Sequence, residues 1–472
     1  MGATAFLLLG LTHCSIPSSS PPNGNAGGST ALGTAGSAGS SGNTAAASQP
    51  GLSGAGGSAA AGSGGLVPSG AGAGGAPDLG PTPATTSAKF PFPQNRLSAN
   101  CRYPAFKNSD VRAAYQWWKA DMVTADGAGG HQRVKRTPTD GGLDMGSTVS
   151  EGIGYGMLIA VYMNDQPLFD DLWKYSLAHT WNGTILMNWY ISSSGALGSN
   201  PSGNGAATDA DEDMAWALVM ADKQWGGQGS LSKSYADYSK QLLNDIWVNE
   251  IHESKLPKNG SSWGDWNSLN ISYFAPAYYR VFAKVTGKAE WGSDVIKCVY
   301  DTIDGNLTDA NGNKSNGLVP AFSNSTGGDA KVGDGQAPLK HNYQYDSCRT
   351  PFRIGLDACL FNDPQAKAYV GKTSSFFGGL GAANIKDGYE LNGMPKPEFP
   401  DKYMGRSAAF IGPAAVGAMH SSQYQTFIDE AWNLLKPNNM WCGGQYYDES
   451  WTLLSMLMMS GNFLDYTVET PK

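Results

Sequence analysis

Apolar residues recur at helical spacing over most of the chain after about residue 108, and the segments between them are short and rich in Gly, Pro and Asn. Apolar positions three and four residues apart predict helices, and few runs alternate as strands do. We therefore predict an all-α domain with eleven helices: Ser109 to Met122, Glu151 to Met163, Pro167 to His179, Asp213 to Trp225, Ser232 to Val248, Ala275 to Val285, Glu290 to Thr302, Asp346 to Leu360, Ser407 to Met419, Gln423 to Leu434 and Ser450 to Met459.

The predicted helices are of two kinds. The segments "DVRAAYQWWKADM" and "SLSKSYADYSKQLLNDIW" are apolar on one face only, whereas "EGIGYGMLIAVYM" and "SAAFIGPAAVGAM" are apolar around the whole circumference. A helix that is apolar all round is buried on every side. An alternation of buried and surface helices is what two concentric rings of helices would produce.

The composition changes sharply along the chain. No Lys, Arg, Asp or Glu occurs from Met1 to Pro77, and residues 15–88 consist mainly of Gly, Ser, Ala, Pro and Thr. Such a stretch buries too little apolar surface to offset the entropy lost on ordering, so we predict a disordered linker there. Residues 89–472 have ordinary globular composition, and we predict that they form one catalytic domain.

The first 14 residues contain a short apolar run that ends at Cys14. The run is too short to span a bilayer and is placed like an export signal. A cysteine at the end of such a run, followed by a long linker, resembles the attachment site of bacterial lipoproteins. We therefore predict a protein that is secreted or anchored at the cell surface through a lipidated Cys14.

Charge and cysteine spacing exclude several classes of function. The net charge is -8 and no basic stripe is present, which argues against a nucleic-acid partner. Five further cysteines show no CxxC or CxxH spacing, so they do not indicate a zinc site. The alternating acids after Thr208 lack the Gly and the Glu that a calcium-binding loop needs. The "GKTSS" segment lacks the first Gly of a phosphate loop. We expect no metal, no cofactor and a monomeric chain.

Three carboxylates lie at the N-terminal edges of predicted inner helices: Glu151, Asp209 and Asp346. If these helices run in the same direction, the three side chains gather at one mouth of the barrel. Each residue also has a purely structural interpretation, because Asp and Glu are common at helix N-caps and in first turns.

The neighbours of these carboxylates favour a chemical role. Arg349 follows Asp346 by three residues, so it shares a helix face with Asp346 and would favour the ionised form that a base needs. Glu151 has no cation within a turn, and Ile153 and Tyr155 would desolvate it. Desolvation raises the pKa of a carboxyl group, as an acid needs. A protonated and an ionised carboxyl group across a groove are the arrangement for glycoside hydrolysis.

Aromatic residues at loop and helix edges fit a sugar substrate, because flat rings stack on the C–H faces of pyranose sugars. Trp189 and Tyr190 lie in the polar loop "LMNWYISSSGALGSNPSGNG", which leads into Asp209, and we predict that both are exposed sugar platforms. Tyr273 is a third candidate for substrate binding.

The segment "ATDADEDMAWALVMADKQW" matches, at every constrained position, the signature of glycoside hydrolase family 8, formerly cellulase family D. "SEGIGYGM" resembles the family segment that bears the general acid, and "YDSCRTPFRIG" resembles the segment that bears the base and its Arg. "NISYFAPAYYRVF" is similar to the aromatic helix between them. The resemblance covers essentially residues 89–472.

The resemblance implies an (α/α)6 barrel and a mechanism that inverts the anomeric configuration. Glu151 would protonate the departing glycosidic oxygen, and Asp346 would activate water on the opposite face of the sugar. Asp209 would hold and distort the sugar just before the cleaved bond. Arg349 and Tyr345 would support Asp346. The remaining acids, Asp211, Glu212 and Asp213, are expected to cap the first turn of their helix.

The family includes endo-β-1,4-glucanases, mixed-linkage glucanases, chitosanases and xylan-active enzymes. Asp346 and the intact signature favour an endoglucanase that acts on cellulose-like β-glucan, with chitosanase and xylanase as alternatives. A non-catalytic surface protein that binds carbohydrate is another alternative, but a pure binder has no use for an acid and base pair. A polysaccharide lyase would need a Tyr, His and Arg base set instead.

Overall fold

The computed structural model describes residues 88–136, 143–199, 202–264, 267–330, 341–400, 404–437 and 445–469. The predicted export signal at residues 1–14, its Cys14 and all but the last residue of the predicted linker lie outside the described residues.

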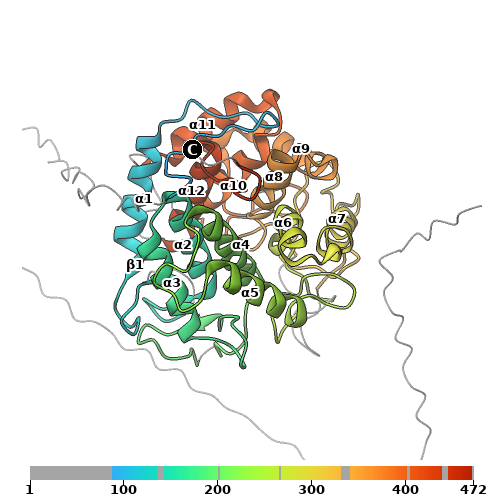
Figure 1. The fold of residues 1–472 in the computed structure, drawn as a ribbon. Helices are drawn as coiled ribbons and strands as arrows, with labels where there is room; N and C mark the ends of the chain where they lie inside the picture. The colour runs from blue at the N-terminus through green and yellow to red at the C-terminus, as the bar shows by residue number, and fades with distance from the viewer. Residues whose placement is uncertain are drawn as a thin grey trace, which may run out of the picture. The chain divides into compact units, whose positions relative to one another are not determined.

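Six helices form a closed inner ring (Figure 1). Each packs against the next, from α2 through α4, α6, α8, α10 and α12 and back to α2. Their bounds are Ser150–Met163 for α2, Thr208–Gln224 for α4, Pro276–Thr286 for α6, Thr350–Phe361 for α8, Ala408–Ala418 for α10 and Tyr446–Met459 for α12.

The other six helices form an outer layer that covers this ring. α1 packs on α12, α3 on α2, α5 on α4, α7 on α6, α9 on α8 and α10, and α11 on α10 and α12. Their bounds are Asn108–Met122 for α1, Gln166–Ala178 for α3, Tyr235–Asn249 for α5, Asp294–Asn306 for α7, Pro364–Leu380 for α9 and Gln425–Leu435 for α11. The predicted all-α class and the (α/α)6 barrel are confirmed.

The inner helices follow from their all-round apolar sequences. Every residue of α10 is buried, as is every residue of α2 except Glu151. Complete burial of one Leu or Ile side chain contributes about 1.5–3 kcal/mol. Small residues let the helices approach closely: a Cβ atom on Gly355 in α8 would lie 3.2 Å from backbone atoms of Gly417 in α10.

The sequence pattern missed one helix and misplaced several helix starts, including that of α8, which begins at Thr350 and not at Asp346. The sequence pattern missed α9, whose segment contains three glycines and several Ser and Thr residues that form helices poorly. Its start was nevertheless signalled, since Asp363 caps the helix and Pro364 is its first residue. The sequence pattern placed the start of α4 at Asp213, but the helix begins at Thr208. The acidic residues of its first turn resembled a surface turn in the sequence, although they are buried in the structure.

Short strands add two small hairpins to the helices. β1 (Val123–Thr124) pairs with β2 (Arg133–Val134), and β3 (Thr148–Val149) pairs with β4 (Tyr190–Ile191), both antiparallel. β3 leads directly into α2, so its pairing with β4 brings the predicted aromatic loop next to the start of that helix. Four 3-10 turns complete the described elements: η1 (Ile271–Tyr273), η2 (Ala289–Trp291), η3 (Ala382–Asn384) and η4 (Ser422–Tyr424).

A disulfide between Cys101 and Cys359 joins the segment before α1 to the last turn of α8. Cys348 is a buried free thiol. In the part of the chain that the structure describes, no helix is both long and apolar enough to cross a membrane.

Candidate active site

The N-terminal ends of the inner helices α2, α4, α8 and α12 meet at one mouth of the barrel. Glu151 lies in the first turn of α2, Asp209 in the first turn of α4, Arg349 directly before α8, and Tyr446 is the first residue of α12. The Arg349 side chain contacts both Glu151 and Asp209, and the Tyr446 hydroxyl donates to Glu151. Each helix therefore directs the positive end of its dipole toward the same group of carboxylates.

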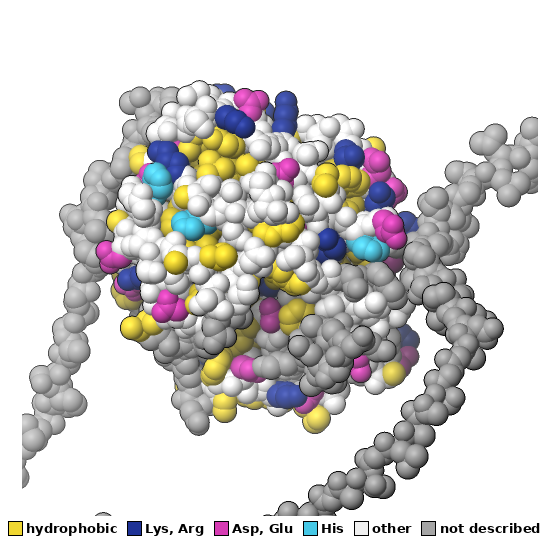
Figure 2. Space-filling view, turned by 90° about the horizontal axis from the view of Figure 1, so that it is seen from below, with side chains coloured by type: hydrophobic (Ala, Val, Ile, Leu, Met, Phe, Trp, Pro, Cys, Tyr) yellow, Lys and Arg dark blue, Asp and Glu magenta, His cyan; other side chains and the backbone are white. Residues whose placement is uncertain are grey.

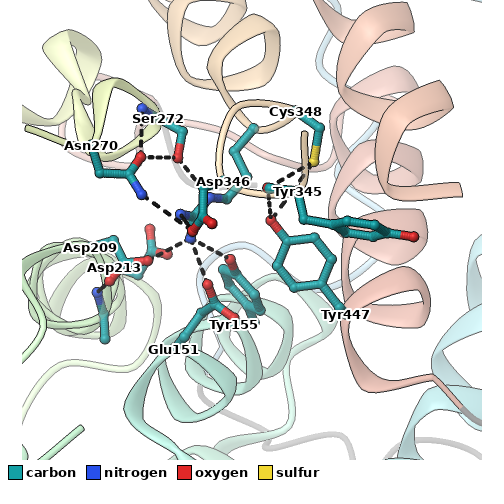
Figure 3. A network of polar contacts seen from close by, with 12 residues as sticks. Glu151, Tyr155, Asp209, Asp213, Asn270, Ser272, Tyr345, Asp346, Cys348 and Tyr447 are labelled. Atoms are coloured by element: carbon teal, nitrogen blue, oxygen red, sulfur yellow. Dashed lines mark hydrogen bonds and ion pairs between the residues drawn. The ribbon is translucent and has the colours of Figure 1, made fainter. Parts of the chain in front are cut away.

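Arg349 connects the three carboxylates that the sequence singled out. Its Nη1 atom lies 2.6 Å from Oε2 of Glu151 and 2.5 Å from Oδ2 of Asp209. Its Nη2 atom lies 3.8 Å from Oδ1 of Asp346. Figure 3 shows Glu151, Asp209 and Asp346 converging on one point, although residues 151 and 346 are far apart in the sequence.

The main partners of Arg349 differ from the prediction. We expected Arg349 to pair with Asp346 on one helix face and expected Glu151 to have no cation nearby. The guanidinium group instead makes its short contacts with Glu151 and Asp209, and its contact with Asp346 is the longest of the three. The reason is that residues from different helices meet across the mouth of the barrel, where spacing along one helix has no bearing.

Glu151 is held ready to carry a proton. Burial, together with the negative charges of Asp209 and Asp346, raises the pKa of its carboxyl group to about 7. The Arg349 guanidinium and a 2.5 Å hydrogen bond from the Tyr446 hydroxyl oppose this effect without cancelling it. The predicted direction of the shift is confirmed, and desolvation is its main cause.

Asp346 has a different environment. Its side chain is 41% exposed, compared with 19% for Glu151 and 2% for Asp209. The side-chain amides of Gln344 and Asn270 donate hydrogen bonds to its two oxygens, at 3.0 Å and 3.3 Å. The site therefore contains two carboxyl groups that are largely shielded from water, those of Glu151 and Asp209, and one that is exposed, that of Asp346, around one guanidinium group.

A cleft of about 550 Å³ opens at this mouth, and Glu151, Asp209, Trp189, Tyr273 and Tyr446 are among the residues that line it. Figure 2 shows the lower end of the barrel in Figure 1, where the loops before α2 and α4 lie; the face is hollowed, and acidic and hydrophobic side chains are visible inside.

Of the two predicted sugar platforms, only Trp189 lines the cleft. Tyr190 is 3% exposed, and a Cβ atom on Gly198 would lie 1.9 Å from its ring, so the loop covers it. Successive side chains of an extended segment point to opposite faces, which is why neighbours 189 and 190 cannot share the cleft. The prediction that Tyr190 is exposed was wrong.

Tyr273 and Tyr345 are placed differently from each other. Tyr273 lines the cleft, with its ring centre 5.0 Å from Cζ of Arg349. The side chain of Tyr345 points away from Asp346 (Figure 3), and its hydroxyl donates to Asp387 at 3.4 Å. The expectation that the Tyr345 side chain supports Asp346 is therefore wrong, because its ring packs among other aromatic rings, including Phe410 and Tyr447.

The other acids of "DADED" do not cap α4, since no side chain caps this helix. Asp211, Glu212 and Asp213 are fully buried. Asp213 forms a two-pronged ion pair with Arg353 on α8, and burial raises the pKa values of Asp211 and Glu212 well above the ordinary range. Because α4 is an inner helix, its first turn faces other helices on every side. Among the described residues, no three His, Cys, Asp or Glu side chains are grouped as a metal site.

Sequence reasoning missed several residues of the site. Tyr446 donates to Glu151 but precedes Ser450, where the pattern placed the start of the last helix. Ser272 accepts a 2.9 Å hydrogen bond from Nε of Arg349, and Asn270 reaches Asp346. The only signal for this pair was the polar start of the aromatic "NISYFAP" segment.

Comparison with known proteins agrees with this geometry. Residues 90–461 match the model of the glycosyl hydrolases family 8. Endoglucanase A of Acetivibrio thermocellus is 36% identical over 389 residues, which cover 79% of this chain and 76% of that protein. The beta-glucanase of Niallia circulans is 33% identical over 401 residues, which cover 80% of this chain and 91% of that protein.

A solved structure shows the same relationship. The apo structure of a beta-1,3-1,4-glucanase from Paenibacillus sp.X4 superposes with a TM-score of 0.69 at 32% identity, and the match covers 79% of this chain and 99% of that one. Family model, relatives and fold agree along the same part of the chain. The protein is a glycoside hydrolase, and it belongs to family 8 of the glycosyl hydrolases.

Proposed function

We propose that the protein is an endo-acting hydrolase of β-1,4-glucan that inverts the anomeric configuration. The observation that carries this proposal is the unequal pair of carboxyl groups that contact Arg349 at one mouth of the barrel. Glu151 has a pKa of about 7 and can hold a proton, whereas Asp346 is exposed to water. General acid and base need these two opposite conditions at one working pH.

Each residue has a separate task in the proposed reaction. Glu151 donates its proton to the departing glycosidic oxygen while Asp346 removes a proton from the attacking water. Arg349 contacts both carboxyl groups through its two terminal nitrogen atoms. A separation of roughly 6.5–9.5 Å is needed for a water molecule to enter, as inversion requires. Asp209 lies at the cleft floor beside Glu151 and would hold the sugar whose bond is cleaved.

The substrate proposal rests on the relatives and on the cleft. Two relatives at 33–36% identity are named endoglucanase A and beta-glucanase, and the similar solved structure is a beta-1,3-1,4-glucanase. Trp189 and Tyr273 give the cleft flat apolar surfaces that suit glucosyl rings. We propose cellulose-like β-1,4-glucan as the main substrate and mixed-linkage β-glucan as a second one.

Reducing-end assays on carboxymethylcellulose, barley β-glucan, chitosan and xylan test the substrate, and NMR of the first product tests the stereochemistry. We expect activity on the two glucans and an α-anomer as the first product from the β-linked chain. A first product with the β-configuration would contradict inversion. Activity on chitosan or xylan alone would contradict the glucan proposal, and no turnover would leave the carbohydrate-binding alternative.

The pH profile should depend on Tyr446. Because Glu151 acts in its protonated form, kcat/KM is expected to fall as the pH rises through about 7. The Tyr446 hydroxyl stabilises the ionised form and so lowers the pKa of Glu151. Tyr446→Phe should therefore raise this pKa and move the alkaline limb upward by about one pH unit.

Tyr447→Phe is the matched control for this prediction. The Tyr447 hydroxyl donates to the carbonyl oxygen of Tyr345 at 2.8 Å and forms no hydrogen bond with Glu151. The control should leave the alkaline limb in place. An alkaline limb that moves downward in Tyr446→Phe, or equally in both variants, would rule out the assigned role of Tyr446.

We further propose that the protein is exported as a monomer, either secreted or held at the cell surface through Cys14. The support is the apolar run before Cys14 and the long segment after it, which has no charged residue up to Pro77. Fractionation of cells that express the full chain, followed by mass spectrometry of its N-terminus, distinguishes a lipidated Cys14 from a cleaved, free form. Retention of the unprocessed chain in the cytoplasm would contradict export.

A further inference from the structure

Two buried side-chain amides enclose the carboxylate of Asp346. Nε2 of Gln344 lies 3.0 Å from its Oδ2 atom, and Nδ2 of Asn270 lies 3.3 Å from its Oδ1 atom. Asn270 is 1% exposed and Gln344 is 5% exposed, so neither is free to turn toward solvent. One amide precedes Asp346 by two residues, and the other comes from the turn before α6.

Backbone groups fix the orientation of both amides. The backbone N–H of Ser272 donates to Oδ1 of Asn270 at 3.1 Å, and the backbone N–H of Asp346 donates to Oε1 of Gln344 at 3.1 Å. A backbone N–H can only donate, so each amide must direct its oxygen to that N–H. The NH₂ group of each amide is then directed at Asp346, and no flipped arrangement satisfies the same contacts.

Asn270 also connects Asp346 to the central arginine. The hydroxyl of Ser272 donates to Oδ1 of Asn270 at 2.8 Å and accepts from Nε of Arg349 at 2.9 Å. The backbone N–H of Asn270 in turn donates to Oδ1 of Asn259 at 2.6 Å. Asn270 is therefore held at three points and cannot follow a movement of Asp346.

We propose that Asn270 and Gln344 are positioning residues for Asp346, whose carboxyl group they aim at the attacking water. The inference rests on the proposed role of Asp346 as the general base. Two donors that carry no charge occupy one lone pair on each oxygen of Asp346, so both ends of the carboxyl group are held in place. They add no titratable group to a site that already contains three carboxyl groups around one arginine.

Asn270→Asp and Gln344→Glu test this inference. Each variant keeps the oxygen that accepts from the backbone and replaces an amide donor by a carboxylate. A second carboxylate about 3 Å away disfavours ionisation of the base, as in other close carboxyl pairs. The acidic limb of kcat/KM on β-glucan should move to higher pH, and kcat should fall about 10- to 100-fold. KM should change little, since neither amide lines the cleft.

Asn259→Asp is the matched control, because it makes the same chemical change in the same network. Asn259 contacts the backbone of Asn270 and has no hydrogen bond with Asp346. An acidic limb that does not move in either test variant, or that moves as far in the control, would overturn the inference. Asn270→Ser removes the amide donor without introducing a charge. This variant should lower kcat without a large shift of the acidic limb. A shift as large as that of Asn270→Asp would also overturn the inference.

Asp346→Asn, assayed in parallel, separates the two levels of the argument. If Asp346→Asn keeps full activity, Asp346 is not the base and the proposed function fails. If Asp346→Asn is inactive while the amide variants keep the pH profile of the unmodified protein, the proposed function stands and only the positioning role fails. Circular dichroism of each variant checks that it is folded before its profile is compared.

Discussion

Replacing Glu151 by Gln is expected to lower kcat on β-glucan by about 10² to 10⁴-fold, because the amide cannot donate a proton to the leaving oxygen. The protonated carboxyl group and the amide have nearly the same shape, so the fold should survive. Arg349 also keeps its short contact with Asp209 in this variant. Initial rates on soluble β-glucan measure the loss, and thermal unfolding checks the fold.

The leaving group can separate the acid from the base. A cellooligosaccharide with a dinitrophenyl leaving group needs no protonation to depart, so Glu151→Gln should regain much of its rate on that substrate. Asp346→Asn should remain slow on it, because the attacking water still needs a base. Equal losses in both variants with both leaving groups would contradict the assignment of Glu151 as the acid.

Glu212→Gln serves as the control for this experiment. Glu212 is fully buried one helical turn beyond Asp209, accepts a 3.0 Å hydrogen bond from Tyr279 and does not line the cleft. Burial raises the pKa of its carboxyl group well above the ordinary range, which favours the neutral form that the amide resembles. This variant should keep its activity, and a large loss would show that any change in a buried acid of the barrel impairs turnover.

Replacing Arg353 by Met is expected to lower the free energy of unfolding by about 3–5 kcal/mol. Arg353 and Asp213 are both buried, and Nη2 of the arginine lies 2.8 Å from Oδ2 of the aspartate. The variant leaves a buried carboxylate without its cation, and this cost is larger than the net value of the pair. Urea denaturation monitored by tryptophan fluorescence gives the free energy.

The double variant Arg353→Met with Asp213→Leu tests the explanation. It removes both charges together, so it should recover most of the lost stability, since a buried ion pair is often no more stable than apolar residues of similar size. Lys297→Met is the surface control: its pair with Asp301 is about half exposed and should cost no more than about 0.5 kcal/mol. A double variant as unstable as the single one would contradict the electrostatic explanation.

The sequence pattern predicted most of the fold because the inner helices have an unusual composition. The segment of α10 is apolar throughout, and only a helix buried on all sides accommodates such a sequence. The pattern failed where local preference and environment disagree. α9 contains weak helix formers and is stabilised by packing on α8 and α10, and the acidic start of α4 resembled a surface turn although it is buried.

The residues of the candidate active site were also predicted only in part. Glu151, Asp209 and Asp346 could be selected because each stands at the start of a predicted inner helix, and the structure brings all three to Arg349. Adjacent residues such as Trp189 and Tyr190 could not be told apart, because the side of the extended segment that faces the cleft depends on its pairing with β3.

By itself, then, the sequence determined the helical class, the order of the helices and the three carboxylates at their starts, since these depend on periodicity and on residue type. The tertiary structure decided which groups touch: that Arg349 contacts Glu151 and Asp209 more closely than Asp346, that Tyr446 donates to Glu151, and that two amides hold Asp346. Except for the contact between Gln344 and Asp346, these contacts join residues that are far apart in the sequence, and their distances are set by how the ring of helices closes, which no local pattern of residues contains.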